Sequence, residues 1–563
     1  MYLPARAANT LVSALAVVLI GVLSPSAAEG PPEGSGDYGD LVALYDAFLA
    51  WKQNPPIVGE LTDSGPWSGI EDYSNKAVRA RRRRVEDFLS ELEDMNVAAW
   101  SRAQQAEYLA VRAKVQQENF RLRISRPWER DPGFYVDQML YLTFVDLPLE
   151  GAALEKTRRE LAAIPVLVKE AKANLDDVAS DYAMLALHNL RNADGVGHGH
   201  PYREVPPPGV IGWYDDLLER ARAQQPSLVP DIEAAKAAVV GFETWLKDNR
   251  DRMDAKAGVG KEAFDWYLKN VKLMPYTSDE VVELGLRELD RLWALYALER
   301  HRNRNLPEIE PADTRKEYER RIRETDAMIR EFLVEEDIIT IPDYIGELGN
   351  NVPWIVRPQG RNFWEEVQYR DPSPDHLHAV IPGHRFDGVV EDNNDHPIRG
   401  RLTDGVRAEG WAVYLEEGMM HAGIFENRPR VRELIYIFGI FRAARVPADV
   451  WLQRNEMTIS EVVDYWRERT PYLDPNVARV DAEIYLRRPP GYGLGYTMGM
   501  LQMQRLLADA RRLQGEDFVL EEFHDAFMAK GRLPLSLIRW EMTGFDDEVQ
   551  DFWESDPLPR VRR

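Results

Sequence analysis

Apolar side chains recur at helical spacing along most of this 563-residue chain, which limits the folds open to it. Within residues 41–49 they fall at i, i+3, i+4, i+7 and i+8, which forms one stripe on a helix. Residues 85–92 and 284–295 repeat the pattern, and Thr277 and Glu280 form a capping box ahead of the second repeat. We therefore expect most of the chain to be helical.

Strand-like alternation is rare, and short extended segments are expected only around residues 338–341 and 351–357. No repeat of 20 to 50 residues is visible, which argues against a helical repeat array. The pattern predicts an all-α fold with few short strands.

Glycine, proline and asparagine cluster at residues 192–209, 303–313 and 346–374, where helices should be interrupted. These breaks are typical of long loops inside one helical body. We expect a single large helical domain over residues 40–563, with a subdivision near residues 192–209 and 303–313 as the alternative.

The first 28 residues have the character of a signal peptide. Arg6 supplies the positive start, residues 11–23 are an apolar run, and residues 26–28 are small, as at a cleavage site. The run falls short of the roughly 20 apolar residues that span a bilayer. We expect cleavage after residue 28, a flexible linker over residues 29–39, and a periplasmic or secreted protein with no stable membrane anchor.

The absence of cysteine and the excess of acid restrict the chemistry. Without cysteine there is no lipidation site at the cleavage point and no thiolate ligand, so a metal must be bound by His, Asp or Glu. The net charge of −24 and the pI near 5.0 repel a phosphate backbone. Nucleic acid is therefore not expected as a partner.

Histidines gather in one part of the sequence. Of ten in the chain, four lie within 21 residues, at His376, His378, His384 and His396. A helical segment that contains Glu409 follows. Two histidines and a glutamate from a later helix are the ligand set of a catalytic zinc site, with the fourth position left for water. We predict that His378, His384 and Glu409 bind zinc.

The spacing of the two histidines requires a bend. On an unbroken helix, side chains six positions apart point about 240° apart. Pro382 and Gly383 lie between them and can interrupt the helix. If the helix resumes at His384, Asp387 lies on the same face as that histidine and becomes a candidate ligand or base.

Other residues nearby have simpler interpretations. His376, beside Asp375, is expected to form a surface or capping pair. Tyr492 and Tyr496 could serve only in packing, and His524 is expected to be structural.

The chain resembles the bacterial proteins of domain of unknown function family 885, over nearly the whole mature sequence. The resemblance rests on short motifs in a fixed order: residues 41–51, Pro275-Tyr-Thr-Ser, Pro382-Gly-His384, Glu409-Gly-Trp-Ala412, Pro490-Gly491 with Tyr496 and Gly499, Phe523-His-Asp525, and Leu533-Pro-Leu535. It implies a mostly helical, often exported protein distantly similar to zinc metallopeptidases. The implied architecture is gluzincin-like, a large multi-helix body around a deep central cleft.

The sequence departs from the family pattern at three positions. The family usually has a glutamate where Ala379 stands, a glutamine where Asp387 stands, and a histidine where Gln453 stands. The glutamate is the presumed base that activates water. The chain is therefore similar to a divergent member that lacks the usual His-Glu base.

The resemblance implies an exported zinc-dependent metallohydrolase that cleaves amide bonds in a peptide or small peptide-like substrate. Asp387 or Glu416 would replace the base, and Tyr496 would stabilise the oxyanion. Arg385 and Arg407 would bind a substrate carboxylate. Because zinc-bound water ionises near pH 7, loss of the base should slow hydrolysis without necessarily abolishing it. The alternative is a pseudoenzyme that acts as a periplasmic ligand-binding protein.

Overall fold

The computed structural model describes residues 30–60, 69–192, 206–357, 360–554 and 556–560. The expected signal peptide lies outside these residues. The described chain is mostly helical, as the periodicity predicted. The capping box at Thr277 and Glu280 is formed and starts a helix of 25 residues.

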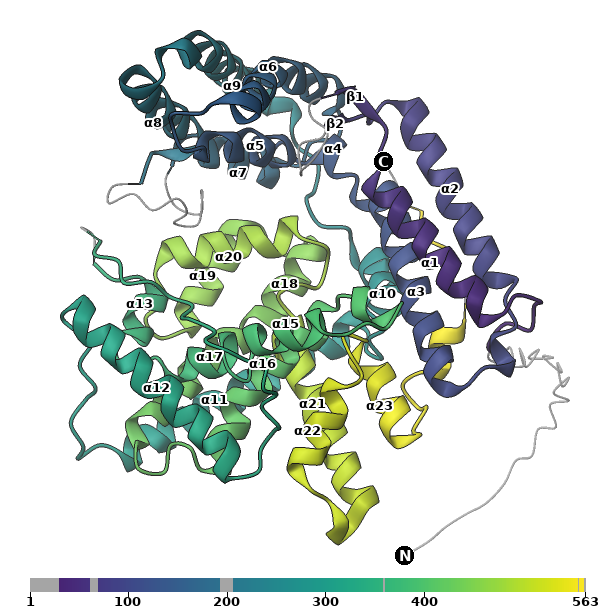
Figure 1. The fold of residues 1–563 in the computed structure, drawn as a ribbon, viewed down its shortest axis with the longest axis vertical. Helices are drawn as coiled ribbons and strands as arrows, with labels where there is room; N and C mark the ends of the chain where they lie inside the picture. The colour runs from purple at the N-terminus through teal and green to yellow at the C-terminus, as the bar shows by residue number, and fades with distance from the viewer. Residues whose placement is uncertain (1–29, 61–68, 193–205, 358–359, 555, 561–563) are drawn as a thin grey trace, which may run out of the picture.

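The chain up to Glu335 contributes three sets of helices (Figure 1). The first comprises α1 (Tyr38–Gln53), α2 (Asn75–Glu93), α3 (Arg102–Phe120) and α4 (Pro127–Arg130). The second comprises α5 (Gly133–Leu140), α6 (Gly151–Asn174), α7 (Ser180–Arg191), α8 (Gly209–Gln224) and α9 (Val229–Asn249). The third comprises α10 (Lys261–Asn270), α11 (Ser278–Arg302) and α12 (Arg315–Glu335).

The remaining helices form the centre and the C-terminal part of the molecule. They are α13 (Phe363–Gln368), α14 (Ser373–Ala379), α15 (His384–Asp392), α16 (Gly405–Ala422), α17 (Pro429–Ala443), α18 (Arg445–Gln453), α19 (Ile459–Arg469), α20 (Pro475–Arg487), α21 (Gly495–Gln514), α22 (Leu520–Met528) and α23 (Leu535–Thr543).

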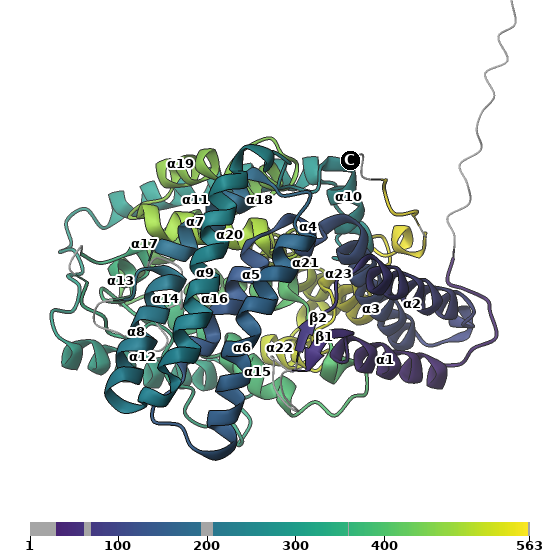
Figure 2. The same ribbon diagram turned by 90° about the horizontal axis from the view of Figure 1, so that it is seen from above.

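These helices are arranged in groups around a central pair. Figures 1 and 2 show α1–α3 together at one side and α5–α9 together on another. Helices α16 and α21 lie near the centre and pack against each other. The Gly- and Pro-rich interruption predicted at residues 192–209 falls between α7 and α8, and those two helices are in contact. That break therefore lies inside one helical group.

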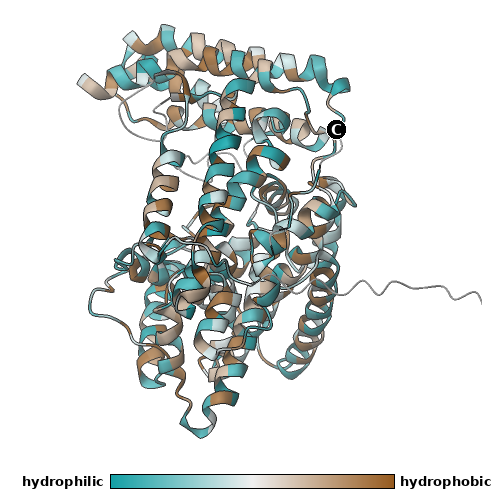
Figure 3. Ribbon diagram, turned by 90° about the vertical axis from the view of Figure 1, so that its right-hand side faces the viewer, coloured by the Kyte–Doolittle hydropathy of each residue, from teal (hydrophilic) through white to brown (hydrophobic). Residues whose placement is uncertain are grey.

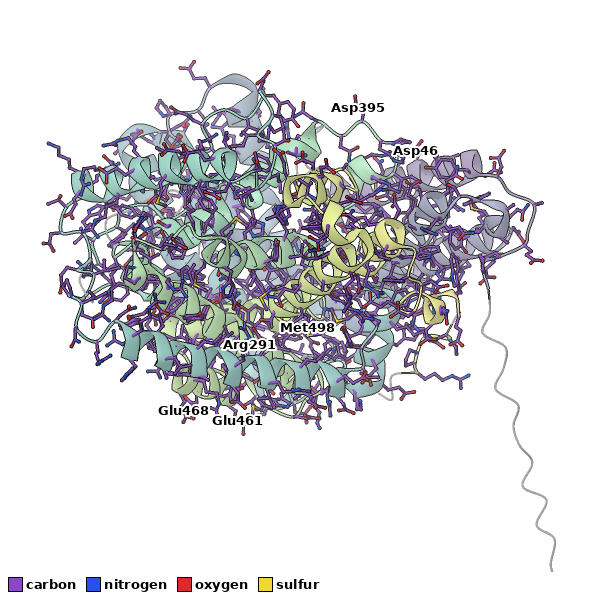
Figure 4. All side chains as sticks on the ribbon, turned by 90° about the horizontal axis from the view of Figure 1, so that it is seen from below. Asp46, Arg291, Asp395, Glu461, Glu468 and Met498 are labelled. Atoms are coloured by element: carbon purple, nitrogen blue, oxygen red, sulfur yellow. The ribbon has the colours of Figure 1, made fainter. Side chains whose placement is uncertain are left out.

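One apolar core joins most of these elements, with members from Leu41 to Phe552. Hydrophobic and hydrophilic residues alternate along individual helices in Figure 3, which is the amphipathic pattern of the sequence. Acidic residues such as Asp46, Asp395, Glu461 and Glu468 are exposed at the periphery in Figure 4. In the described part, no helix has the length and apolarity needed to cross a membrane.

The strands of the described chain do not lie where extended segments were predicted, at residues 338–341 and 351–357. The two strands of the described chain, β1 (Ile57–Glu60) and β2 (Gly69–Glu71), pair antiparallel. Residues 338–341 form no ladder because side chains of α22 satisfy their backbone: the Ile338 carbonyl contacts His524, and the Thr340 N–H donates to Asp525. Residues 351–357 are also irregular.

The expected linker is partly attached to the body. The Gly34 and Gly36 N–H groups donate to the carbonyls of Met95 and Asp94, beyond the end of α2. Asp37 then caps α1 through a reciprocal pair of hydrogen bonds with Asp40.

Two glycines let α16 and α21 approach closely. A Cβ on Gly410 would lie 2.5 Å from the Cα and carbonyl carbon of Gly499, so the helix backbones touch there. Glu409 immediately precedes Gly410, and Tyr496 lies one turn before Gly499. The crossing therefore places a predicted ligand of α16 beside a predicted oxyanion donor of α21.

Candidate metal centre

The three predicted metal ligands come together in the structure. His384 Nε2 lies 3.2 Å from His378 Nε2 and 3.0 Å from Glu409 Oε2, and His378 Nε2 lies 3.5 Å from Glu409 Oε2. They also stand out as a group of possible ligand atoms within 4.8 Å of one another. One nitrogen or oxygen of each residue faces the same point.

These separations fit a zinc ion. With zinc–ligand bonds of 2.0–2.1 Å in a tetrahedron, neighbouring ligand atoms lie about 3.3 Å apart. The observed 3.0–3.5 Å brackets that value. The donor set of two imidazoles and a carboxylate also suits zinc. The side chain of His384 is 33% exposed, so the point is reachable from solvent.

The Pro-Gly segment provides the bend that the spacing required. Helix α14 ends at Ala379 and α15 begins at His384, so the two histidines belong to different helices. A Cβ on Gly383 would overlap the His378 carbonyl, so only glycine permits this tight return. Trp411 Nε1 donates to the Pro382 carbonyl at 2.9 Å and fixes the turn to α16.

Glu416 and Arg442 support His378 from behind. Glu416 Oε1 lies 2.9 Å from His378 Nδ1, the ring nitrogen that faces away from the triad. Arg442 of α17 pairs with the other carboxylate oxygen, and both charged side chains are at most 2% exposed. A carboxylate behind a histidine ligand fixes the ring orientation and raises its basicity. Arg442 was not among the predicted site residues, because its contact with Glu416 depends on the packing of α17.

The electrostatics of the triad favour a shared positive charge. Burial opposes ionisation of Glu409, but hydrogen bonds with His378 and His384 outweigh it and hold the pKa of the carboxyl well below its usual range. Burial and Arg442 lower the pKa of His378, whereas Glu409 and Glu416 raise it, with a net increase. A cation at this point would take over the role of the proton that stabilises Glu409.

Two tyrosines border Glu409. The Tyr492 hydroxyl donates to Glu409 Oε1 at 3.4 Å and lies 3.2 Å from the Tyr496 hydroxyl. Burial raises the pKa of both phenols, so at neutral pH each remains a hydrogen-bond donor. Tyr496 is thus beside the triad as predicted, while Tyr492 was considered only for packing. Its spacing of four residues from Tyr496 was the available signal.

The other predicted catalytic and substrate-binding residues are engaged elsewhere. Asp387 is 2% exposed and pairs with Arg407 at 2.5 Å, and Arg407 is fully buried. The pair therefore offers neither a free base nor an exposed cation. Glu416 is held between His378 and Arg442. Arg385 donates to the carbonyls of Leu348 and Asn350 and fastens that loop to α15.

The remaining histidines of the cluster lie outside the triad. His376 is buried and contacts Asp326 at 2.9 Å, so the expected surface pair with Asp375 was wrong. His524 has the structural role that was expected, between the Tyr414 hydroxyl and the Ile338 carbonyl. A cavity of 590 Å³ lies apart from the triad and is lined by residues such as Leu306, Met328 and Arg428.

The fold and the site together define a class: large all-α proteins with a candidate His₂Glu metal centre between helices. The model of a family described as "Bacterial protein of unknown function (DUF885)" matches residues 60–333 and 376–542. The chain belongs to this family. The second matched region begins at His376 and contains the whole triad.

Solved structures share the fold at low sequence identity. One, described as "a putative lipoprotein of unknown function from Shewanella oneidensis", is 16% identical with a TM-score of 0.65, covering 90% of this chain and 100% of that one. Another, "the putative lipoprotein from Colwellia psychrerythraea", is 17% identical with a TM-score of 0.63, covering 84% and 92%. No curated protein matches the sequence. At these identities the likeness concerns the fold alone.

Proposed function

We propose that this protein is an exported zinc-dependent hydrolase that cleaves amide bonds in peptides or peptide-like compounds. The observation that carries the proposal is the convergence of His378, His384 and Glu409 at the separations of tetrahedral zinc ligands, with His384 open to solvent. Export is supported by the character of residues 1–28 and by the description of both solved neighbours as a "putative lipoprotein".

Each residue around the triad has a defined task in this proposal. His378, His384 and Glu409 hold the ion, which when bound polarises a carbonyl and acidifies water. Glu416 and Arg442 fix the ring of His378. Tyr492 donates to Glu409, and Tyr496 beside it offers a hydroxyl donor to the oxygen that gains negative charge.

A second candidate is a ligand-binding pseudoenzyme with the same metal centre. Two observations favour it. Ala379 stands where the family usually has a glutamate, and both carboxylates predicted as substitutes, Asp387 and Glu416, are held in buried ion pairs. If the protein is a hydrolase, the missing general base should make its turnover slower by orders of magnitude than that of family members that have the glutamate.

The first test is the metal content of the purified mature protein, measured by mass spectrometry after zinc loading. We expect one zinc per chain in the wild type and none in His384→Ala or Glu409→Ala. Exposed Glu468→Ala on α19 serves as a matched control and should retain zinc. A wild type without zinc would overturn the proposal. With zinc present, hydrolysis of a peptide library with and without chelator separates the hydrolase from the pseudoenzyme.

A further inference from the structure

The structure points to Arg488 as the residue that recognises a carboxylate on the ligand of the triad, and we propose this role for it. The inference rests on the proposed function and deepens it, because it defines the substrate class. The substrate would be a peptide or peptide-like compound with a free carboxylate close to the amide held at His378, His384 and Glu409.

Arg488 lies one tyrosine ring away from the metal centre. Its guanidinium carbon is stacked 4.5 Å from the centroid of the Tyr492 ring. The hydroxyl at the far end of that ring is 3.4 Å from Glu409 Oε1. An extended peptide spans about 3.5 Å per residue. A substrate carboxylate bound to Arg488 would therefore lie within about three residues of a substrate amide bound at the triad.

Arg488 is a free cation, unlike its charged neighbours. Its side chain is exposed and has no carboxylate partner in the part of the chain that the structure describes. By contrast, Arg487 pairs with three acidic residues, Arg445 with Asp481, and Arg442 with Glu416. The cations near the site are neutralised by the protein itself, and Arg488 remains available to a ligand.

Two features limit where the guanidinium can lie before any ligand arrives. Arg488 follows the last residue of α20 as its C-cap and has an extended backbone, and Pro489 after it restricts that backbone further. Its position over the Tyr492 ring limits the side chain, and within the described residues its guanidinium makes no hydrogen bond, so two N–H groups are available to one carboxylate. The protein as a whole carries a net charge of −24 and repels anions, so a free cation one tyrosine ring from the triad favours an anionic ligand at this place.

The test compares three probes on the full mature chain loaded with zinc. The probes are N-acetyl-tetra-alanine with a free C-terminal carboxylate, the same peptide as its C-terminal amide, and an amide-capped peptide with one internal aspartate. Calorimetric titration gives the affinity of each. We expect the wild type to bind at least one of the carboxylate probes about tenfold or more tightly than the neutral amide. Whichever carboxylate probe binds more tightly than the neutral amide shows whether a C-terminal carboxylate or an aspartate side chain is recognised.

Variants assign this preference to Arg488. Arg488→Ala should abolish it, while Arg488→Lys keeps part of it, because an ammonium retains the charge without the paired donors. Arg287→Ala is the matched control, since Arg287 is an exposed arginine of α11 paired with Glu283. It should keep the full preference. Where turnover is measurable, Arg488→Ala should raise KM with little change in kcat.

The opposing results are specific. Equal binding of charged and neutral probes by the wild type, binding of none of them, or a preference that survives in Arg488→Ala would overturn the role of Arg488. Zinc is measured in the same samples. A wild type without zinc that still prefers carboxylates through Arg488 would refute the hydrolase and leave the carboxylate site intact.

Discussion

At the scale of single residues, Ala379 is the most informative position. It is the last residue of α14, directly after His378, and is 6% exposed. The groups around it are three candidate ligands, one of them a histidine with a carboxylate behind it, and two tyrosine hydroxyls. What the family usually adds at this position is a carboxylate. Of the three departures from the usual pattern, this one removes the group that would deprotonate water in the proposed hydrolase.

Replacing Ala379 by glutamate should restore that group. A positioned general base typically accelerates a reaction by about 10² to 10⁴-fold, so we expect kcat/KM for peptide hydrolysis to rise by about that range. Ala379→Gln has the same size without the base and should stay at the wild-type rate. Initial rates with zinc-loaded proteins measure the effect, and equal rates for the glutamate and glutamine variants would count against the hydrolase proposal.

Glu416 gives a second prediction at this scale. Glu416→Gln should weaken zinc binding about 10- to 100-fold, because the ring of His378 loses its charged partner. Glu417→Gln is the control, since the neighbouring Glu417 pairs with Arg291 and His421 outside the triad. Competition with a chromophoric chelator measures both affinities. Indistinguishable dissociation constants would show that Glu416 does not support the ligand.

At the scale of elements, the crossing of α16 and α21 determines the geometry of the site. Gly410 and Gly499 remove the side chains that would keep the two helices apart. This contact sets the position of Glu409 relative to Tyr496, which comes from a distant part of the sequence. Small residues at this crossing therefore serve packing and the candidate site together.

Gly410→Ala should separate these helices. The new methyl group would lie 2.5 Å from Gly499 atoms, and overpacking of this kind costs about 1–3 kcal/mol, against about 1 kcal/mol gained in helix propensity. We expect lower stability in denaturant titrations and weaker zinc binding. A Cβ in Gly418→Ala on the same helix would meet nothing nearer than the Tyr414 ring at 3.5 Å, so this substitution should be neutral or stabilising. Equal changes in stability and zinc affinity for Gly410→Ala and Gly418→Ala would contradict the close contact of α16 and α21 at Gly410.

The comparison of sequence and structure also belongs to this scale. The helices were predictable because amphipathic spacing is local, and so was the triad, whose ligands lie close together along the chain. The extended segments at 338–341 and 351–357 were not, because apolar runs do not reveal whether another strand or a distant side chain satisfies the backbone. Arg442 and Tyr492 were missed for the same reason: their contacts with Glu416 and Glu409 arise only from packing.

At the scale of the whole molecule, His524 links three distant parts of the chain. It lies on α22 and contacts the Tyr414 hydroxyl of α16 at 2.9 Å and the Ile338 carbonyl at 2.7 Å. Burial is the main cause that lowers the pKa of His524, to about 4. The folded protein therefore holds this histidine neutral at pH values where the unfolded chain would bind a proton.

This difference makes stability depend on pH. The pKa of His524 is about 4 in the folded protein and about 6.5 in the unfolded chain. The stability associated with the neutral histidine is therefore fully present above pH 6.5 and is lost as pH falls toward 4. From about pH 6.5 to about pH 4.5, the wild type should lose about 2 kcal/mol more unfolding free energy than His524→Gln. Chemical denaturation at several pH values measures this difference.

The variant is needed because Asp449 acts in the opposite direction. Burial raises the pKa of Asp449 to about 7, so its contribution favours the folded state at low pH and is lost as pH rises from about 4 to about 7. The titrations of His524 and Asp449 partly cancel in the wild type. Identical pH slopes for the wild type and His524→Gln would show that His524 does not titrate as its burial indicates.

The arrangement of the triad along the chain has a consequence for the order of folding. His378, His384 and Glu409 come from three successive helices, so gathering them closes only short loops and costs little chain entropy. The tyrosines of α21 and its preceding turn arrive from much further along the sequence. If the protein binds zinc as proposed, the site on α14–α16 would therefore form before α21 docks. The ion would then act as a nucleus around which α21 docks.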